Sequence, residues 1–194
     1  MIMKNNLDTS LVDKAILYAT KHHKGTRRKG KDIPYILHPL EAMAIVSTIT
    51  EDQELIAAAA LHDLIEDTSV TYDDINKEFG KRIADIVLSE SNNAIENHEN
   101  LSWHQIREKN LEILKNASLD CKIVALGDKL SNIRSIHNDY NNIGDKLWDR
   151  FNEKNPLEHK WRYIELTKCF NGLEDTIAYQ EFKALVFMVF DGIK

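Results

Sequence analysis

The sequence predicts an all-α protein, and three observations favour that class. Apolar residues recur every three or four positions over most of the chain, which is the spacing that places them on one face of a helix. The 194 residues include only seven glycines and three prolines, too few to supply the turns of a many-stranded β fold. No stretch alternates apolar and polar residues for long, and no segment repeats at a fixed period. We therefore expect a single helical domain over residues 1–194.

Each expected helix has a signal at its start or along its apolar face. Ser10 with Asp13 and Thr71 with Asp74 match the capping-box spacing that opens a helix. Pro39 suits a first helical turn, because the N–H that proline lacks is not needed there. One expected helix starts at residue 10, one opens at the Thr71–Asp74 capping box and ends before Gly80, and one follows from residue 81. The others cover 38–49, 53–66, 103–114, 119–136, 156–170 and 174–190, with a polar connection over 91–102.

Composition excludes several classes of protein. The net charge of −6 argues against a nucleic-acid binder held by phosphate attraction. Cys121 and Cys169 are too few and too far apart for a secreted disulfide framework, so we expect thiols in a reducing compartment. The N-terminus has no apolar signal region, and the longest apolar runs fall far short of the ~20 residues that span a bilayer. A cytoplasmic protein without a membrane span is expected.

The strongest chemical motif is the segment 61–67, which follows an apolar run over 56–61. On a continuous helix, His62, Asp63, Glu66 and Asp67 would share an arc of roughly 140°. Three carboxylates buried together must be paired, protonated or bound to a cation, so a divalent metal is the functional interpretation. The alternative is that the first two residues cap the helix and the last two form its solvated end.

Two further candidate ligands occupy positions that are otherwise hard to explain. His38 follows the apolar stretch at 34–37, and Asp128 interrupts the apolar run of the long helix over 119–136. Gly127 leaves room for a close approach beside Asp128. Two imidazoles with two carboxylates suit manganese, iron or zinc and leave positions for water and substrate. Taken singly, His38 is equally well a helix-cap residue and Asp128 a satisfied polar residue.

A basic run over residues 21–31 holds six lysines or arginines and no acidic residue. Such concentrated positive charge in an acidic chain, flanked by Gly25 and Gly30, suits a loop that draws a polyphosphate toward the metal. The alternative is a solvated basic loop or an arm that touches RNA.

In this order, the motifs resemble the hydrolase domain of RelA/SpoT-type HD-domain proteins. The resemblance covers residues 11–136. No synthetase region follows in this sequence, so its length resembles that of the stand-alone small alarmone hydrolases and not that of a bifunctional enzyme. The matching segments are PYILHPL at 34–40, AAALHDLIEDT at 58–68, FG at 79–80 and LGDKLSNIR at 126–134.

The resemblance implies an all-helical fold and hydrolysis of the 3′-diphosphate of guanosine tetra- or pentaphosphate, giving GDP or GTP and pyrophosphate, with manganese. Its metal ligands would be His38, His62, Asp63 and Asp128. Glu66 and Asp67 would orient and deprotonate the attacking water. The residues that would meet the nucleotide are Arg28, Lys29, Asn132, Ser135 and Tyr163.

Departures from the family pattern leave alternatives open. Gly127 stands where the family often has alanine, and the loop over 28–33 differs from the family loop that contacts the base. Adenosine alarmones or NADPH are therefore alternative substrates. A further alternative is a module that binds a nucleotide without catalysis, although the presence of both Glu66 and Asp67 favours an enzyme.

Overall fold

The computed structural model describes residues 7–91, 95 and 100–193. These residues form helices and connecting loops, together with one isolated β-bridge between Arg27 and Pro34, which confirms the all-α class. The helices are α1 (Ser10–His22), α2 (Leu37–Val46), α3 (Gln53–Leu61), α4 (Leu64–Asp67), α5 (Tyr72–Phe79), α6 (Lys81–Glu90), α7 (Trp103–Asn116), α8 (Leu119–Ile143), the 3-10 helix η3 (Gly144–Arg150), α9 (Pro156–Leu166) and α10 (Ile177–Phe190).

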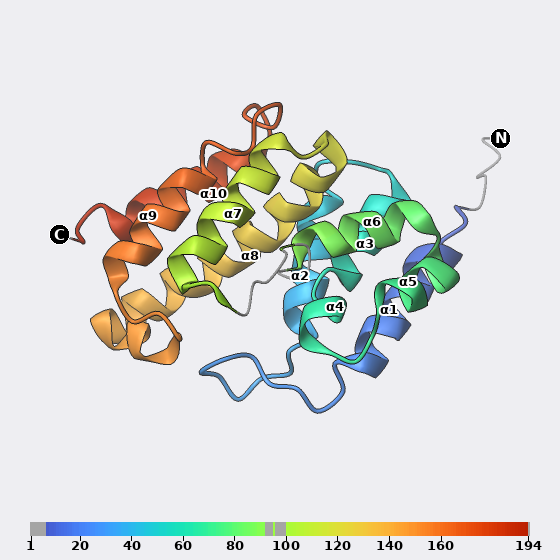
Figure 1. Cartoon of the computed structure of the whole chain (residues 1–194), viewed down its shortest axis with the longest axis horizontal. Coiled ribbons are helices and arrows are strands. Elements are labelled where there is room, and N and C mark those ends of the chain that lie inside the picture. Colours follow the sequence, from blue (N-terminus) through green and yellow to red (C-terminus); the bar gives the residue numbers. More distant parts are fainter. Residues whose placement is uncertain (1–6, 92–94, 96–99, 194) are drawn as a thin grey trace, which may run out of the picture.

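The long helix α8 runs through the middle of the molecule and connects its two sides (Figure 1). On one side, α1, α3, α5 and α6 pack on one another, and α2 packs between α3 and α8. On the other side, α7, α9 and α10 pack together and against α8. The apolar faces of these helices form a continuous buried core. No helix in the described part of the chain is long and apolar enough to cross a membrane.

The local signals for helix starts were right at one position and wrong at another. Thr71 and Asp74 form a complete capping box at α5. At α1 the cap residue is Thr9, whose hydroxyl donates to Asp13 across 2.8 Å, so the box expected at Ser10 is absent. The 3-10 helix η3 was not predicted, and α8 continues seven residues beyond the expected end. Residues 92–94 and 96–99 of the expected polar connection lie outside the described residues.

The helix expected over 53–66 is interrupted at the chemical motif. Helix α3 ends at Leu61, and His62 and Asp63 form a turn before α4 begins at Leu64. The His62 ring bonds the carbonyl of Ala59 in the last turn of α3, at 2.8 Å. Such side-chain bonds to the backbone compete with helix continuation. The turn carries His62 into the core and leaves the end of α4 at the surface.

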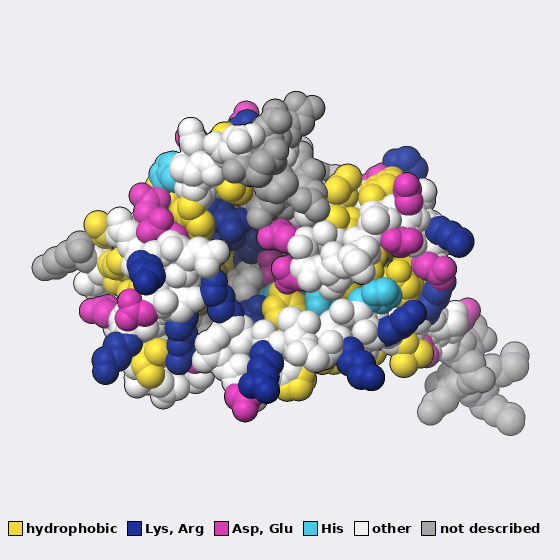
Figure 2. All heavy atoms as spheres, turned by 60° about the horizontal axis from the view of Figure 1, so that its bottom comes forward, with side chains coloured by type: hydrophobic (Ala, Val, Ile, Leu, Met, Phe, Trp, Pro, Cys, Tyr) yellow, Lys and Arg dark blue, Asp and Glu magenta, His cyan; other side chains and the backbone are white. Residues whose placement is uncertain are grey.

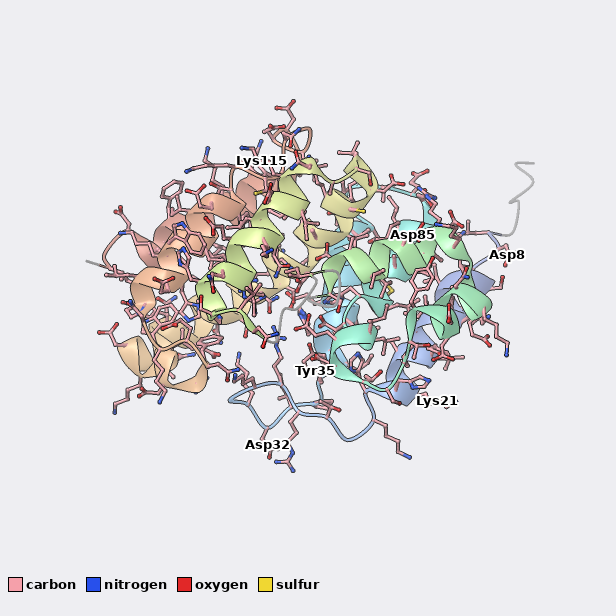
Figure 3. The ribbon with its side chains drawn as sticks, in the orientation of Figure 1. Asp8, Lys21, Asp32, Tyr35, Asp85 and Lys115 are labelled. Carbon is pink, nitrogen blue, oxygen red and sulfur yellow. The ribbon has the colours of Figure 1, made fainter. Side chains whose placement is uncertain are left out.

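The basic run folds back on itself as a hairpin-like loop between α1 and α2. The N–H of Arg28 donates to the carbonyl of Ile33 at 3.0 Å, and that of Tyr35 donates to Thr26 at 2.9 Å. Gly30 adopts a positive φ of 73°, which favours glycine at the bend. In Figure 3, Asp32 lies at the outer end of this loop and Tyr35 lies where the chain returns to the helices. The loop is therefore held in place beside the centre of the molecule.

Helices α2 and α8 approach so closely that one contact allows only glycine. A Cβ atom added at Gly127 would lie 2.8 Å from the carbonyl oxygen of Ala42 and 2.7 Å from a methyl group of Val46. The backbones of the two helices are therefore nearly in contact. Because His38 is on α2 and Asp128 is on α8, this packing brings the two side chains together.

Candidate metal centre and nucleotide cavity

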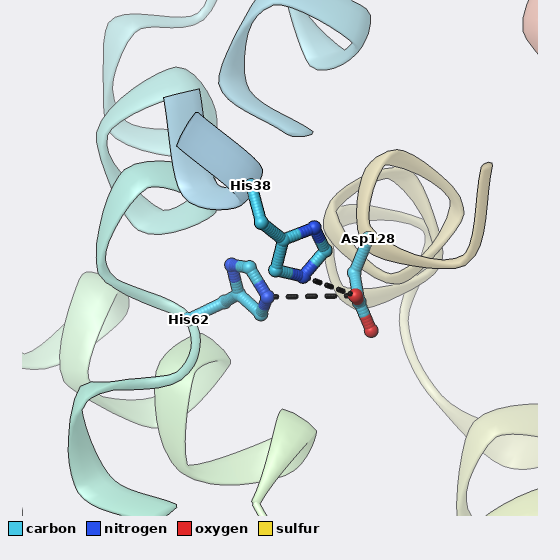
Figure 4. A group of neighbouring side chains, drawn as sticks. All are labelled: His38, His62 and Asp128. Atoms are coloured by element: carbon cyan, nitrogen blue, oxygen red, sulfur yellow. Dashed lines mark ion pairs between the residues drawn. The ribbon is translucent and has the colours of Figure 1, made fainter. Parts of the chain in front are cut away.

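Three buried side chains from separate elements converge at the centre of the bundle. His38 comes from α2, His62 from the turn after α3 and Asp128 from α8 (Figure 4). The Oδ1 atom of Asp128 lies 3.0 Å from Nε2 of His38 and 3.5 Å from Nε2 of His62. Within the described residues these three form a group that could hold a metal ion, with all ligand atoms within 4.8 Å of one another.

Hydrogen bonds on the far side of each ring assign the tautomers of both histidines. The Nδ1 atom of His62 lies 2.8 Å from the carbonyl oxygen of Ala59, which can only accept, so this nitrogen carries the proton. The Nδ1 atom of His38 lies 2.8 Å from Oγ of Ser131, and that hydroxyl donates to Glu41 at 2.8 Å. The serine oxygen is thus the acceptor for His38. In its neutral form, each ring therefore presents the Nε2 lone pair to the centre.

The converging donor atoms fit a divalent cation. Two Nε2 lone pairs and a carboxylate oxygen repel one another at these distances unless a positive charge, either a proton or a metal ion, lies between them. Among the described residues, Nε2 of His62 is buried without a hydrogen-bond partner. Imidazole nitrogens with carboxylate oxygens form a mixed donor set that suits manganese, iron or zinc. The geometry thus supports a metal site at the three residues.

The pKa shifts of His62 and Asp128 also indicate that this group of side chains favours a positive charge. Burial opposes the charged form of His62, but Asp63 and Asp128 outweigh it and hold the pKa of His62 well above its ordinary value. Burial also opposes the charged form of Asp128, yet Lys129 and the two histidines hold the pKa of Asp128 well below its usual range. Burial lowers the pKa of His38 despite both aspartates. The carboxylates therefore remain charged and attract a cation.

Asp63, the fourth predicted ligand, borders this group. Its Oδ2 atom lies 3.0 Å from Nε2 of His62 and 3.5 Å from Nε2 of His38, and it accepts a hydrogen bond from the hydroxyl of Tyr35. Tyr35 was not predicted. The PYILHP motif contains it, but nothing in the local pattern shows that it contacts a residue 28 positions away.

The remaining oxygen of Asp128 lies in a charged network that the sequence did not reveal. Lys129 donates to Oδ2 of Asp128, and its ammonium group lies 3.3 Å from the carboxylate of Glu90. The side-chain amide of Asn132 donates to Oδ1 of Asp128, and Arg28 in turn donates to the amide oxygen of Asn132. Two of the predicted nucleotide-binding residues thus lie next to the metal group.

Glu66 and Asp67 lie at the end of α4, outside the buried group of His38, His62 and Asp128. Both side chains are exposed, because the turn at residues 62–63 places them at the surface end of α4. Asp67 lines the cavity that is described next. Desolvation and the nearby charge of Asp63 nevertheless raise the pKa of Asp67, while a hydrogen bond from Tyr35 opposes the rise.

A cavity of about 510 Å³ lies beside the metal group, large enough for a nucleotide. It brings together residues from the basic loop, α4, α7, α8, η3 and α9. Asp67 and all five predicted nucleotide-binding residues line it: Arg28, Lys29, Asn132, Ser135 and Tyr163. Figure 2 shows the hollow, with lysines and arginines on one wall and acidic side chains on the other. The sequence did not predict the lining cations Arg107, Arg150 and Arg162.

This fold and site define a class: an all-helical protein with a buried His-His-Asp group beside a charged cavity. A family model described as "HD domain" matches residues 15–151. The chain therefore belongs to the HD-domain family.

Two curated relatives are named guanosine-3′,5′-bis(diphosphate) 3′-pyrophosphohydrolase MESH1. The one from Xenopus tropicalis is 34% identical over 133 residues, which cover 66% of this chain and 71% of the relative. The one from Danio rerio is 31% identical over 136 residues, covering 69% and 73%.

Longer relatives and solved structures support the same assignment. GTP pyrophosphokinase rsh of Brucella melitensis is 35% identical over 136 residues, and the chain spans only 18% of its length. A solved metazoan orthologue of SpoT has a TM-score of 0.73 at 20% identity, covering 93% of this chain and 96% of that one, which shows the shared fold. The structure of lmo0812 from Listeria monocytogenes has a TM-score of 0.70 at 28% identity, covering 85% and 99%. The resemblance to RelA/SpoT-type HD-domain hydrolases is thus confirmed.

Proposed function

We propose that this chain is a manganese-dependent hydrolase of guanosine 3′,5′-bis(diphosphate) alarmones, releasing pyrophosphate and leaving GDP or GTP. The main support is the cavity beside the His-His-Asp group. All five residues that the family resemblance implies as nucleotide contacts line this cavity. The names of the MESH1 relatives support the substrate class. Such an activity would lower alarmone levels in a stringent response.

In this proposal, His38, His62 and Asp128 hold the metal, with Asp63 beside them as the fourth ligand. When bound, the ion supplies a positive charge that polarises the phosphate and lowers the pKa of water. Glu66 and Asp67, at the exposed end of α4, orient the attacking water and accept its proton. The raised pKa of Asp67 suits a base, because proton transfer is most effective when the pKa of the base is near the working pH.

The nucleotide lies in the cavity between the basic loop and α8. Arg28 and Lys29 meet its base and phosphates, while Asn132, Ser135 and Tyr163 line the nucleoside. Water attacks the phosphorus bonded to the ribose 3′-oxygen, that P–O bond breaks, and the 3′-oxygen takes up a proton. The diphosphate leaves as pyrophosphate, so atoms and charges balance.

The decisive experiment incubates the purified protein and manganese with a panel of 3′-diphosphates of guanosine and adenosine nucleotides and with NADPH. Ion-exchange chromatography and ³¹P NMR identify the products. We expect pyrophosphate and GDP or GTP from the guanosine compounds, and none from the His62→Ala or Asp128→Ala variants. Exclusive release of phosphate from NADPH, or of pyrophosphate from the adenosine compounds, would replace the proposed substrate. Binding of a nucleotide without turnover would indicate a non-catalytic module.

A further inference from the structure

The basic loop between α1 and α2 is bonded along one face of α8. Arg28 donates to the amide oxygen of Asn132, and Lys31 donates to the hydroxyl of Ser135 at 3.1 Å. The Nζ atom of Lys31 also lies 3.0 Å from Oδ1 of Asp139, one turn farther along the helix. Positions 132, 135 and 139 follow one another at helical spacing, so they share a face of α8. The loop therefore reaches from the α1 and α2 side of the molecule to the C-terminal half of α8 (Figure 1).

Asp139 also holds a second cation that touches the same loop. The Nη1 atom of Arg150, in η3, lies 3.2 Å from Oδ2 of Asp139, while Lys31 meets the other carboxylate oxygen. The side chain of Asp139 is 14% exposed, so both ion pairs are largely shielded from water. Arg150 contacts the bend of the loop, because a Cβ atom added at Gly30 would lie 2.5 Å from Cδ of Arg150. Lys31, Asp139 and Arg150 thus form an anchor for the loop.

The other side-chain bonds of the loop involve residues that the nucleotide would use. Arg28 and Lys29, which the proposed function assigns to the nucleotide, bond to Asn132 and Asn152. All four residues line the large cavity, so a bound nucleotide would compete for the same donors. Lys31 is not one of the described residues that line this cavity. Its ion pair with α8 can therefore persist while the neighbouring bonds exchange.

We propose that Asp139 is a positioning residue that holds the basic loop on α8 through Lys31 and Arg150. With the loop anchored there, Arg28 and Lys29 can exchange their own bonds for contacts with the substrate. This inference rests on the proposed function and deepens it, because it divides the cations of the loop into one that anchors and two that bind. A loop held in place binds more tightly, since apparent affinity falls with the fraction of molecules whose site is competent to bind.

The charge of Asp139 provides a test in which two roles give opposite results. Asp139 itself lines the cavity, so its negative charge opposes the entry of an anionic substrate. If the residue acted through its charge alone, Asp139→Asn would leave Lys31 and Arg150 uncompensated and lower KM. If the residue positions the loop, the same substitution raises KM. The direction of the change therefore separates the two roles.

The kinetic test measures kcat and KM for guanosine 3′,5′-bis(diphosphate) in Asp139→Asn, Lys31→Met and the double variant. We expect KM to rise about tenfold in each single variant, the result when the loop is docked about a tenth of the time. The kcat value should change little, because bound nucleotide holds the loop, whereas a folding defect would lower kcat and leave KM unchanged. The double variant should match Lys31→Met, since both substitutions remove one anchor. Asp85→Asn on α6 is the matched control, because this carboxylate pairs with Lys81 at 2.6 Å and does not line the cavity.

The second test needs no catalysis and measures the order of the loop without nucleotide. Millisecond hydrogen exchange follows the amides of Arg28, Lys31 and Tyr35, which form backbone hydrogen bonds within the loop. Exchange over residues 26–35 should become faster in Asp139→Asn and Lys31→Met and stay unchanged in Asp85→Asn. Unchanged exchange in Asp139→Asn, or a KM equal to or below that of the wild type, would overturn the positioning role. If exchange becomes faster but the wild type hydrolyses no nucleotide, the proposed function fails and the loop anchor stands.

Discussion

Replacing Ser131 by alanine tests how the metal group is held. In the wild type, the hydroxyl of Ser131 accepts from Nδ1 of His38 at 2.8 Å and donates to Glu41 at 2.8 Å. His38 and Ser131 are 4% and 1% exposed, so water cannot easily replace the lost hydroxyl. Alanine leaves the N–H of His38 buried without an acceptor, which costs about 1–3 kcal/mol.

The lost hydrogen bond weakens metal binding because the His38 ring can change to its other tautomer. When Nδ1 has no acceptor, the proton can move to Nε2 and donate to Asp128, which lies 3.0 Å away. That tautomer removes the lone pair that a metal needs. We therefore expect Ser131→Ala to weaken metal affinity about ten- to a hundredfold, the usual effect of losing the partner that orients a histidine ligand.

The assay is competition for manganese or zinc against a chromophoric chelator, with nitrogen NMR of the imidazoles as a direct readout of the tautomer. Glu41→Gln should have a smaller effect, because glutamine still offers a carbonyl oxygen to Ser131. Ser47→Ala is the control, since Ser47 is exposed and bonds only its own helix. Metal affinity within twofold of the wild type in Ser131→Ala, with an unchanged tautomer, would refute the reasoning.

Four further predictions concern the reaction, the nucleotide and the fold. Glu66→Gln should lower kcat by about 10² or more with metal content unchanged; an unchanged kcat would assign the proton transfer to Asp67. Tyr35→Phe removes a hydrogen bond that lowers the pKa of Asp67, so this pKa should rise further. A base acts when deprotonated, so the acid limb of the kcat/KM profile should move to higher pH, and a fixed limb would contradict the assignment. Arg28→Lys should recover little of the affinity that Arg28→Ala loses, as measured by KM, if the planar guanidinium is what binds. Gly127→Ala should destabilise the fold by about 1–3 kcal/mol, measured by chemical unfolding.

The residues of the metal group could be predicted because each one interrupts an apolar pattern locally. His62 follows a run of alanines and leucine, and Asp128 lies within the buried face of α8. Their partners could not be predicted in the same way. Ser131 lies 93 residues from His38 along the chain, and a serine on a helix has no feature that indicates a buried histidine beside it. Only the packing of α2 on α8 brings the two residues together.

The exposure of Glu66 and Asp67 differs from the expectation because the sequence suggests one continuous helix over 53–66. Uninterrupted helical geometry would place Glu66 and Asp67 on the buried face with His62. The turn at residues 62–63 separates α3 from α4, and both carboxylates lie at the exposed end of α4. The arginines of α7 and α9 were missed for a related reason: charged positions on an amphipathic helix are usually solvated, and the sequence does not show that Arg107 and Arg162 both face a cavity.

At Gly127 the local inference of a close approach was correct, but the sequence did not indicate which group approaches. The sequence suggested room for a close approach beside Asp128, and the structure has that approach, but the group that approaches is the backbone of α2 at Ala42, which leaves no space for a Cβ atom. His38 is one helical turn before Ala42, so the distance between the two helices sets the distance from His38 to Asp128, 3.0 Å. Glycine at this position therefore helps to set the separation of His38 and Asp128. A Cβ atom at this position would force α2 and α8 farther apart or rotate one of them, and the separation of His38 and Asp128 would change with it.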